Sequence, residues 1–535
     1  MVKLISMKIV NLEKNFFKIF LFIFFFTGSY YSLQTGISID EWQEQRNWEY
    51  NVALFKHIIS GKNLDPEFIN YPDKYYGVGF QIVSQPIQFL LSEIILKLQN
   101  INFFGAHLIA KHFVVFLTFF LSGIFVYLIF KKIIKNSYFC ITAAILYFLY
   151  PYLLGHGLFN PKDIPFLCFW IICTYISLNI FTDLLDNKDL KYSKVLIIAF
   201  LSSFLISIRI SGTLIFIQYL FTFIVFLKLS EIKLNSFVKS TYKKILFFIL
   251  LTFLFVYLLH PVYWLNPLLF FDAINYMGKH FNDVCTLTLG KCMFSKNLDP
   301  TYIPIWFLVK LPVIILIGLI LLPLTEKKIF NNKNSNIIFA TLLFSSFFIP
   351  IILTVFNVHL YDELRQILFL VPLIFIVGTI SLYIFSKKIF YILSFLSILF
   401  FLIENIKIYP HQYVWFNTPS RVLNLSKNFE LDYWGLSGRE LSENISIINE
   451  QVARKPCVLA SPPWIIKPFL DEKLYSCFGI YQDIESGFPR PFLAVQNVRN
   501  LKKGKSYKCD TIYESKFNFL FTKEDIVTGR LIKCI

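Results

Sequence analysis

The sequence predicts a polytopic α-helical membrane protein of about eleven transmembrane helices, followed by a small extracytoplasmic α/β domain. Three observations support this fold class. The chain has 535 residues, of which 56% are hydrophobic, and its mean hydropathy of +0.59 is well above that of soluble globular proteins. Apolar runs of about 20 residues, enough to cross a hydrocarbon layer roughly 30 Å thick, recur through residues 1–405. Residues 406–535 are much more polar.

The formal net charge of +17 comes largely from lysines that stand in short clusters between the apolar runs. This distribution is typical of cytoplasmic loops under the positive-inside rule and unlike a nucleic-acid-binding face, so no nucleic-acid partner is expected. Four lysines precede the first apolar run and put the amino terminus in the cytoplasm: Lys3, Lys8, Lys14 and Lys18. We expect a multi-pass protein of the bacterial inner (plasma) membrane with a periplasmic carboxyl terminus.

The first helix is expected at residues 17–36, as a retained helix rather than a signal peptide, because no small-x-small cleavage site follows it. A large first outer loop, residues 37–106, comes next. Within it, residues 45–60 and 79–99 place apolar side chains at helical spacing opposite polar ones, which indicates amphipathic helices lying in the membrane interface. The second segment is also long enough to span the membrane if its polar face were buried in protein.

Ten further transmembrane helices are expected, with lysine-rich turns on the cytoplasmic side. Residues 195–227 form an apolar run interrupted by one charge, Arg209, and a single helix of this length would be about 50 Å long, so we divide the run at "RISG". The expected helices are 107–130, 138–154, 164–182, the two within 195–227, 245–260, 303–323, 337–356, 366–385 and 389–405. The transmembrane domain therefore comprises residues 1–405. In the tail, residues 406–535, "CVLASPPW" and "FNFLFTK" predict strands of the α/β domain.

The nine cysteines divide in agreement with this topology. Three fall in predicted helices, where cysteine behaves as a small apolar residue: Cys140, Cys168 and Cys173. The other six fall in segments placed outside, where an even number indicates disulfide bonds. One pair is local, and the last four cysteines allow three connectivities. The pairs we favour are Cys285–Cys292, Cys457–Cys477 and Cys509–Cys534.

Ionisable residues gather at the outer ends of the predicted helices, whereas the cytoplasmic loops contain lysine with only scattered acids. The outer set comprises Asp40, Glu41, Lys162, Asp163, Arg209, His260, Asp362 and Arg365. Each has an ordinary explanation, since Asp163 could cap a helix, Arg209 could anchor at the interface, and the others could be solvated charges or surface pairs. Their accumulation on one side favours a functional site, because charges at membrane depth need partners that offset their desolvation.

These residue types could support transfer from an anionic lipid donor. A carboxylate facing an acceptor hydroxyl can act as a general base. Arginines and a lysine can hold a phosphate and stabilise the negative charge that develops on a phosphate leaving group. The histidines His156, His260 and His359 show no metal-ligand spacing, so no zinc site is expected.

Several short motifs follow one another along the chain in a specific order. They are "IDEW", "FNPKDIPF", "IRISG", "HPVYWLNP", "LYDELRQILFLVP", "YPHQYVWFN" and "LDYWG". This series resembles the integral-membrane glycosyltransferases of the C superfamily (GT-C). More narrowly, it is similar to family 39, which includes the protein O-mannosyltransferases and the bacterial aminoarabinose transferase. Members of this family take sugar from a polyprenyl-phosphate carrier and invert the anomeric centre.

The resemblance implies roles for particular residues. It aligns Asp40 with the catalytic acid of the first outer loop, with Glu41 beside it, and Asp163 with the second acidic position. Three cations are implied on the phosphate side of the donor: Lys162, Arg209 and Arg365. Related bacterial sequences often have histidine where this chain has Gln366, so the resemblance gives that position no role. Metal use varies in the superfamily, and a divalent cation between the acids remains open.

The resulting hypothesis is an inverting glycosyltransferase at the periplasmic face. It would move a sugar from an undecaprenyl-phosphate donor to an acceptor hydroxyl on a glycolipid, a polysaccharide or a protein, in contact with membrane lipid. The alternative is a transporter or flippase of lipid-linked sugars. That class predicts charged or broken helices near the bilayer midplane and often repeated halves. The ionisable residues here lie at helix ends, and no repeat is found.

Overall fold

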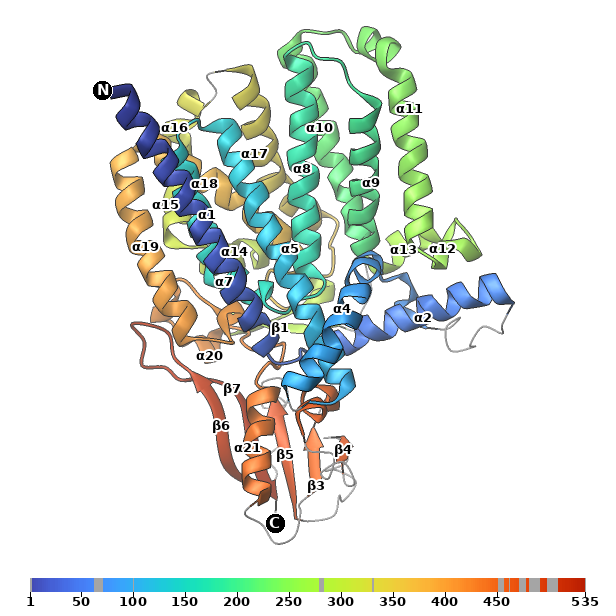
Figure 1. Ribbon diagram of the computed structural model, residues 1–535, viewed down its shortest axis with the longest axis vertical. Coiled ribbons are helices and arrows are strands. Elements are labelled where there is room, and N and C mark those ends of the chain that lie inside the picture. Colours follow the sequence, from blue (N-terminus) through green and yellow to red (C-terminus); the bar gives the residue numbers. More distant parts are fainter. Residues whose placement is uncertain are drawn as a thin grey trace.

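A bundle of long helices forms most of the molecule, and a small sheet lies at one end of it (Figure 1). The amino terminus lies at the opposite end of the bundle from the sheet. The computed structural model describes residues 2–61, 71–99, 101–278, 283–329, 332–450, 457–460, 462–470, 478–480, 491–497 and 509–534. Within these ranges, nine helices are long and apolar enough to cross a membrane, or eleven if each of two bent pairs is one span. The predicted polytopic helical fold is thereby confirmed.

The long helices follow the apolar runs of the sequence. They are α1 (Val2–Gln34), α5 (Phe103–Ile133), α8 (Asp163–Leu185), α9 (Tyr192–Ile208), α10 (Ile215–Ser230), α11 (Leu234–Leu259), α17 (Lys333–Val355), α18 (Val371–Phe385) and α19 (Lys387–Lys407). The run 195–227 is broken where expected. Arg209 has an extended backbone, and the short helix η2 (Ile210–Leu214) leads into α10.

Two other predicted helices are bent at prolines, which lack the amide hydrogen of a regular helix. The pair α6 (Ser137–Leu149) and α7 (Pro151–Gly157) meets at 62°. The single helix expected at 303–323 was wrong. It consists of α14 (Tyr302–Lys310) and α15 (Val313–Ile320), bent by 120°, followed by α16 (Leu322–Ile329). The break has a local cause, because the residue before a proline is driven out of the helical region and Leu311, before Pro312, is extended.

The first outer loop contains α2 (Glu41–Ser60), η1 (Pro72–Tyr75) and α4 (Gly79–Leu98). Helix α2 runs across the end of the bundle (Figure 1). In α4 part of the polar face is buried, including Gln81 and Gln88, whereas Glu93 and Lys97 of that face are exposed, as are Leu90 and Leu98. An interfacial helix with its polar face in water was expected. In its buried part, the structure instead matches the alternative in which that face is covered by protein, because Gln88 Nε2 donates to the carbonyl of His107 in α5.

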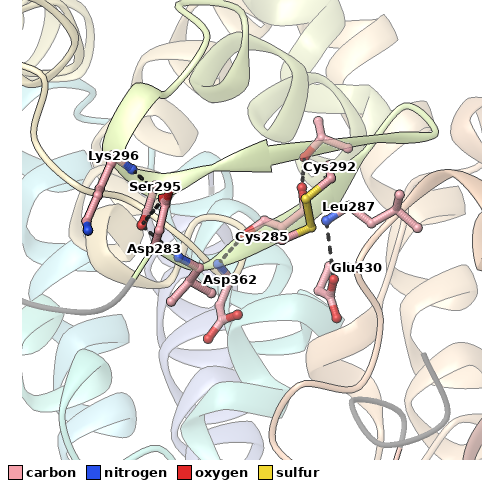
Figure 2. The surroundings of a disulfide bond; sticks show 11 residues. Asp283, Cys285, Leu287, Cys292, Ser295, Lys296, Asp362 and Glu430 are labelled. Carbon is pink, nitrogen blue, oxygen red and sulfur yellow. Dashed lines mark hydrogen bonds between the residues drawn. A yellow bond between two sulfur atoms is a disulfide. The ribbon is translucent and has the colours of Figure 1, made fainter. Parts of the chain in front are cut away.

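A disulfide-bonded hairpin contacts the loop that precedes α18. Helices α12 (Val262–Leu265) and α13 (Leu269–Met277) lead to strands β1 (Cys285–Thr288) and β2 (Lys291–Phe294), then to η3 (Ser295–Asn297). The strands are antiparallel and joined by the predicted Cys285–Cys292 bond (Figure 2).

A linker connects α19 to the tail domain through η5 (Gln412–Val414), η6 (Pro419–Val422) and α20 (Leu425–Asn428). The tail contains α21 (Gly438–Glu450), η7 (Pro463–Ile465), η8 (Lys467–Phe469) and a sheet of order β4-β3-β5-β7-β6. Its strands are β3 (Cys457–Ala460), β4 (Phe478–Ile480), β5 (Phe492–Asn497), β6 (Asp510–Phe517) and β7 (Ile526–Cys534). Strands β3, β4 and β5 are parallel, whereas β7 is antiparallel to β5 and β6. A small α/β domain was predicted, and the mixed sheet with α21 beside it agrees (Figure 1).

The described residues of the tail contain one of the two disulfide bonds predicted for it, and they lack one of its predicted strands. The predicted Cys509–Cys534 bond is present, and Cys477 of the third expected pair lies outside the described residues. The strand expected at "FNFLFTK" was wrong, because β6 ends at Phe517 and the next residues form its connection to β7. That connection packs on the linker and on α19, where the amide of Leu520 donates to Glu404 Oε1 at 2.7 Å. Phe519 of this segment is fully buried there, whereas Phe521 is exposed.

Candidate active site at the outer end of the bundle

Four parts of the chain bring charged side chains together at the end of the bundle that faces the sheet. Asp40 immediately precedes α2, Asp163 begins α8, and Arg209 occupies the break between α9 and η2. Arg365 begins the short helix η4 (Arg365–Leu370), just before α18. We call this group, with Asp362, the charged cluster.

Arg365 is the centre of the charged cluster. Its three guanidinium nitrogens face three different carboxylates. Nη2 forms an ion pair with Asp40, Nη1 lies 3.1 Å from Asp362 Oδ2, and Nε lies 3.7 Å from Asp163 Oδ2. The guanidinium also lies 4.3 Å from the ring centre of Trp434. A planar, permanently charged fork is the side chain best suited to hold several carboxylates in one geometry.

Asp163 is held from several sides. Its Oδ1 lies 2.7 Å from Arg209 Nη1, and its Oδ2 accepts from Asn160 Nδ2 at 2.9 Å. The side-chain oxygen of Asn160 in turn accepts from the amide of Asp163. Asn160 therefore satisfies the first amide of α8, and the Asp163 carboxylate is available to pair with arginines.

Exposure separates the acids of the charged cluster. The Asp40 side chain is 40% exposed, whereas Asp163 is 0% and Asp362 is 2% exposed. A general base has to reach the proton that it abstracts. Asp40 is thus the acid of this cluster that an incoming hydroxyl can reach.

Lys162 is nearly buried and has its own partners. Its Nζ lies 2.6 Å from Glu44 Oε1 and 3.3 Å from the ring centre of Tyr76. Burial lowers the pKa of Lys162 below its ordinary value, and the Glu44 carboxylate opposes that shift. Sequence reasoning missed Glu44, although it stands one helical turn after Asp40, at the spacing that puts two residues on one face.

Glu41 lies apart from the charged cluster. Its side chain is fully buried, its Oε1 accepts from the amide of Ser38 at 2.7 Å, and its Oε2 lies 2.9 Å from His112 Nε2 in α5. The bond to Ser38 fixes the turn that leads into α2, two residues before its N-cap, Asp40. These contacts join the first outer loop to α5, and they differ from the expected place of Glu41 beside the reacting groups.

The loop before Arg365 has an unusual backbone that several contacts hold. Asp362 and Glu363 have positive φ angles of 54° and 66°. The amide of Asp362 donates to Thr286 Oγ1 in β1 at 2.9 Å, which links this loop to the disulfide hairpin (Figure 2). Residues with such angles persist only where the surroundings fix them, commonly at functional sites.

Two residues of α14 hold Glu363 in place. Lys310 Nζ, at the break between α14 and α15, lies 2.9 Å from Glu363 Oε1, and Tyr302 Oη donates to the Glu363 carbonyl at 3.0 Å. Burial raises the pKa of Glu363 to about 8, with Lys310 acting in the opposite direction. Lys310 and Glu363 were not among the residues predicted from sequence.

A cavity of about 120 Å³ adjoins the charged cluster. Lys162 and Arg209 line it, together with polar and aromatic side chains from the surrounding loops: Tyr76, His359, Tyr361 and Gln366. Two predicted cations therefore share one cavity wall. Burial raises the pKa of Tyr361 to about 12, so its hydroxyl stays protonated and able to donate at neutral pH.

The acids do not form a metal-binding set. Among residues that the structure describes, no three His, Cys, Asp or Glu side chains converge into a group that could hold a metal ion. The carboxylates of Asp40 and Asp163 contact arginines instead. His156 Nδ1 lies 3.0 Å from Asn160 Nδ2, and His260 stacks on Tyr263. The side chains present do not fit a cation between the two acids.

Comparisons with known proteins returned structures rather than sequences. No family model and no curated protein matches the chain. ArnT from Cupriavidus metallidurans in the apo state is similar, with a TM-score of 0.47, 9% identity, and coverage of 99% of this chain and 98% of that chain. The same protein bound to undecaprenyl phosphate gives a TM-score of 0.47, 9% identity and 97% coverage of both chains. The apo oligosaccharyltransferase of Archaeoglobus fulgidus gives 0.42, 9% identity, and coverage of 90% and 70%. These values are low, so we base the functional proposal on the site itself.

Proposed function

We propose that this protein is an inverting glycosyltransferase of the GT-C type. It transfers a sugar from a polyprenyl-phosphate donor, undecaprenyl phosphate in a bacterium, to an acceptor hydroxyl at the periplasmic face of the membrane. The observation that supports this most directly is one accessible carboxylate, Asp40, next to a cavity lined by Lys162 and Arg209. The resemblance of the ordered motifs to family 39 agrees with this reading.

In the proposed reaction, the Asp40 carboxylate takes the proton of the acceptor hydroxyl while the hydroxyl oxygen bonds to the anomeric carbon. The bond between that carbon and the phosphate oxygen breaks on the opposite side, so the configuration inverts. The electron pair leaves with the polyprenyl phosphate, whose charge Arg209 and Lys162 stabilise. Arg365 and Asp163 hold Asp40 and Arg209 in place, and Glu41 acts indirectly by fixing the start of α2.

The proposed orientation puts the charged cluster and the tail in the periplasm and the amino terminus in the cytoplasm. The lysine clusters support this orientation, and the two chain ends lie at opposite ends of the bundle (Figure 1). The donor's polyprenyl tail would then lie in the bilayer, with its phosphate at the charged cluster. Glycolipid, polysaccharide and protein acceptors all offer the hydroxyl that this chemistry needs.

The test uses the full chain in lipid nanodiscs with undecaprenyl-phosphate-linked sugars, and mass spectrometry measures release of undecaprenyl phosphate. We expect Asp40→Asn to bind radiolabelled undecaprenyl phosphate within about threefold of the wild type. Its turnover should fall by roughly 100-fold or more, the usual cost of losing a general base. Asp189→Asn, in a loop at the far end of the bundle, is the control. Near-normal turnover of Asp40→Asn would refute the assignment of the base.

The transporter alternative makes a different prediction. Two strongly bent helix pairs are present, as that class requires, but the charged cluster lies at the end of the bundle. A flippase would move an undecaprenyl-phosphate sugar across proteoliposomes without breaking its sugar–phosphate bond. Translocation with an intact donor would favour the transporter, and cleavage of the donor favours the enzyme.

A further inference from the structure

A second cavity lies on the other side of α2 from Lys162 and the first cavity. It is a groove of about 460 Å³ between α2, α4 and the start of α5. The two cavities share no lining residue. Glu44 contacts Lys162 of the first cavity, and the next residue, Gln45, lines the groove. Successive residues of a helix point about 100° apart, so the first turns of α2 form the partition between the two cavities.

Polar side chains line the groove in a hydrogen-bonded series, and two of the lining residues, Glu49 and Lys56, are charged. Gln45 Nε2 donates to Glu49 Oε1 at 3.2 Å, and Gln45 Oε1 accepts from Gln85 Nε2 at 2.9 Å. Gln85 Oε1 lies 3.1 Å from His107 Nε2, and His107 Nδ1 lies 3.2 Å from Ser92 Oγ. These bonds fix the amides and the imidazole in place. Each amide still has a second donor or acceptor position for a ligand.

Aromatic rings form the other walls of the groove: Trp48, Phe89, Phe103 and Phe104. Phe89 is 68% exposed and Phe103 is 46% exposed. Rings of this kind pack against the C–H faces of a sugar, while amides form hydrogen bonds to its hydroxyls. Small-molecule sites typically combine apolar walls with a small number of polar groups. The lining therefore has the chemistry of a carbohydrate site.

The groove opens onto an apolar helix face. On α4, Phe89 and the next residue, Leu90, are largely exposed, and they have hydrocarbon rather than water as their natural surroundings if α4 lies at or in the membrane. A ligand that fills the groove and follows this face needs a polar head and an apolar chain.

The groove also adjoins the proposed base. Gln45 and Glu49 follow Asp40 on α2 by about 8 and 14 Å of helix rise. Between them and Asp40, the ring of Trp42 packs 5.1 Å from Phe104 of the groove wall. A bound sugar that extends from the groove along α2 would pass the ring of Trp42 to reach Asp40, the exposed acid of the charged cluster.

We propose that this groove binds the sugar head of a membrane glycolipid, which is the acceptor of the transfer. The inference rests on the proposed function and narrows its acceptor from three classes to one. Donor phosphate and acceptor sugar then approach Asp40 from opposite sides of α2. The acceptor's lipid chains lie along the exposed face of α4.

Photo-crosslinking in cells tests the occupant. A benzophenone amino acid replaces Val52 in the groove, and another replaces Leu220, an exposed residue of α10, as the lipid-facing control. Mass spectrometry then identifies the adducts. We expect glycolipid adducts to be at least fivefold enriched at Val52 over Leu220. The same phospholipids at both positions, or peptide adducts at Val52, would overturn the proposal.

Binding measurements separate this inference from the proposed function. We expect Trp48→Ala and Gln85→Ala to bind undecaprenyl phosphate like the wild type, and to bind nanodisc-embedded glucosyl diacylglycerol at least tenfold more weakly. Phe253→Ala, an exposed phenylalanine of α11, is the control. Free maltose serves as the competitor that lacks a lipid chain, and equal competition by maltose would contradict a lipid-linked ligand. If the wild type fails to bind undecaprenyl phosphate, the proposed function fails, whatever the groove variants do.

Discussion

The two sides of α2 carry different kinds of side chain. On one side, acids pair with buried arginines and a lysine, and Arg365 alone faces three carboxylates. On the other side, amides and aromatic rings line an open groove that contains two charged residues, Glu49 and Lys56. Asp40 and Glu41 show the contrast within two residues, since one joins the charged cluster and the other bonds to His112. A fixed net of charges suits an anionic leaving group, whereas amides and aromatic rings suit a sugar.

After Asp40→Asn, the largest loss on the charged side is expected from Arg365→Lys. A lysine keeps the charge but has one nitrogen and cannot face three carboxylates at once. We expect donor turnover to fall by roughly 100-fold, because misplacement of a catalytic group costs about that much. Arg421→Lys, which alters a buried pair with Glu404 away from the charged cluster, is the matched control. It should lower the thermal transition temperature and leave turnover of the folded fraction unchanged. Equal turnover losses in both variants would remove the special role of Arg365.

Glu41→Gln is expected to affect stability more than catalysis. The substitution weakens buried bonds to Ser38 and His112, which we expect to cost about 1–3 kcal/mol of unfolding free energy. Thermal unfolding in detergent should therefore shift to lower temperature, while turnover per folded molecule falls far less than in Asp40→Asn. A turnover loss as large as that of Asp40→Asn would place Glu41 with the reacting groups after all.

Removal of the disulfide bond in the hairpin should lower turnover less, because the hairpin acts on the charged cluster through the loop before Arg365. Cys285→Ser with Cys292→Ser should loosen β1, whose Thr286 accepts from the amide of Asp362. We expect turnover to fall by roughly three- to tenfold as the charged cluster becomes less ordered, with donor affinity less affected. Removing the Cys509–Cys534 bond of the tail sheet is the control. If both disulfide variants lose the same activity, the hairpin has no specific link to the site.

The smallest effect concerns pH. The pKa of Glu363 is raised by burial from its ordinary value of 4.5 to about 8. Between these values the folded chain holds a proton that the unfolded chain has released, so stability falls as pH rises toward 8 and levels off above it. In Glu363→Gln this decline of the thermal transition temperature should be shallower. A parallel decline in both proteins would mean that another group controls it.

Much of the fold could be predicted from the sequence, because apolar length and lysine position are local properties. The break at "RISG" is one such case. The sharp bend at Pro312 was missed, since a proline in an apolar run can either kink a helix or end it. The buried part of the polar face of α4 depended on a distant partner, His107, and the amphipathic pattern alone does not say whether water or protein covers that face.

The site shows the same limit. Asp40, Asp163, Arg209 and Arg365 could be assembled from their positions at one set of helix ends. Which acid pairs with which arginine could not be predicted, because Arg365 follows Asp40 by more than three hundred residues. The groups that fix the loop before Arg365, Lys310 above all, sit at the end of an apolar helix and give no sign of their role in sequence. Trp434 belongs to the "LDYWG" motif, yet only the structure puts its ring beside Arg365.

Trp434 also makes the site depend on the order in which the chain is built. Its carbonyl accepts from the amide of Ile39 at 2.9 Å, next to Asp40, and Trp464 Nε1 donates to the Ile39 carbonyl at 2.9 Å. Both tryptophans leave the ribosome after every helix of the bundle. A chain whose tail has not yet packed on the bundle lacks the ring over Arg365 and the bonds that steady Asp40. The charged cluster is therefore complete only after the last part of the chain has been made and has packed on the bundle.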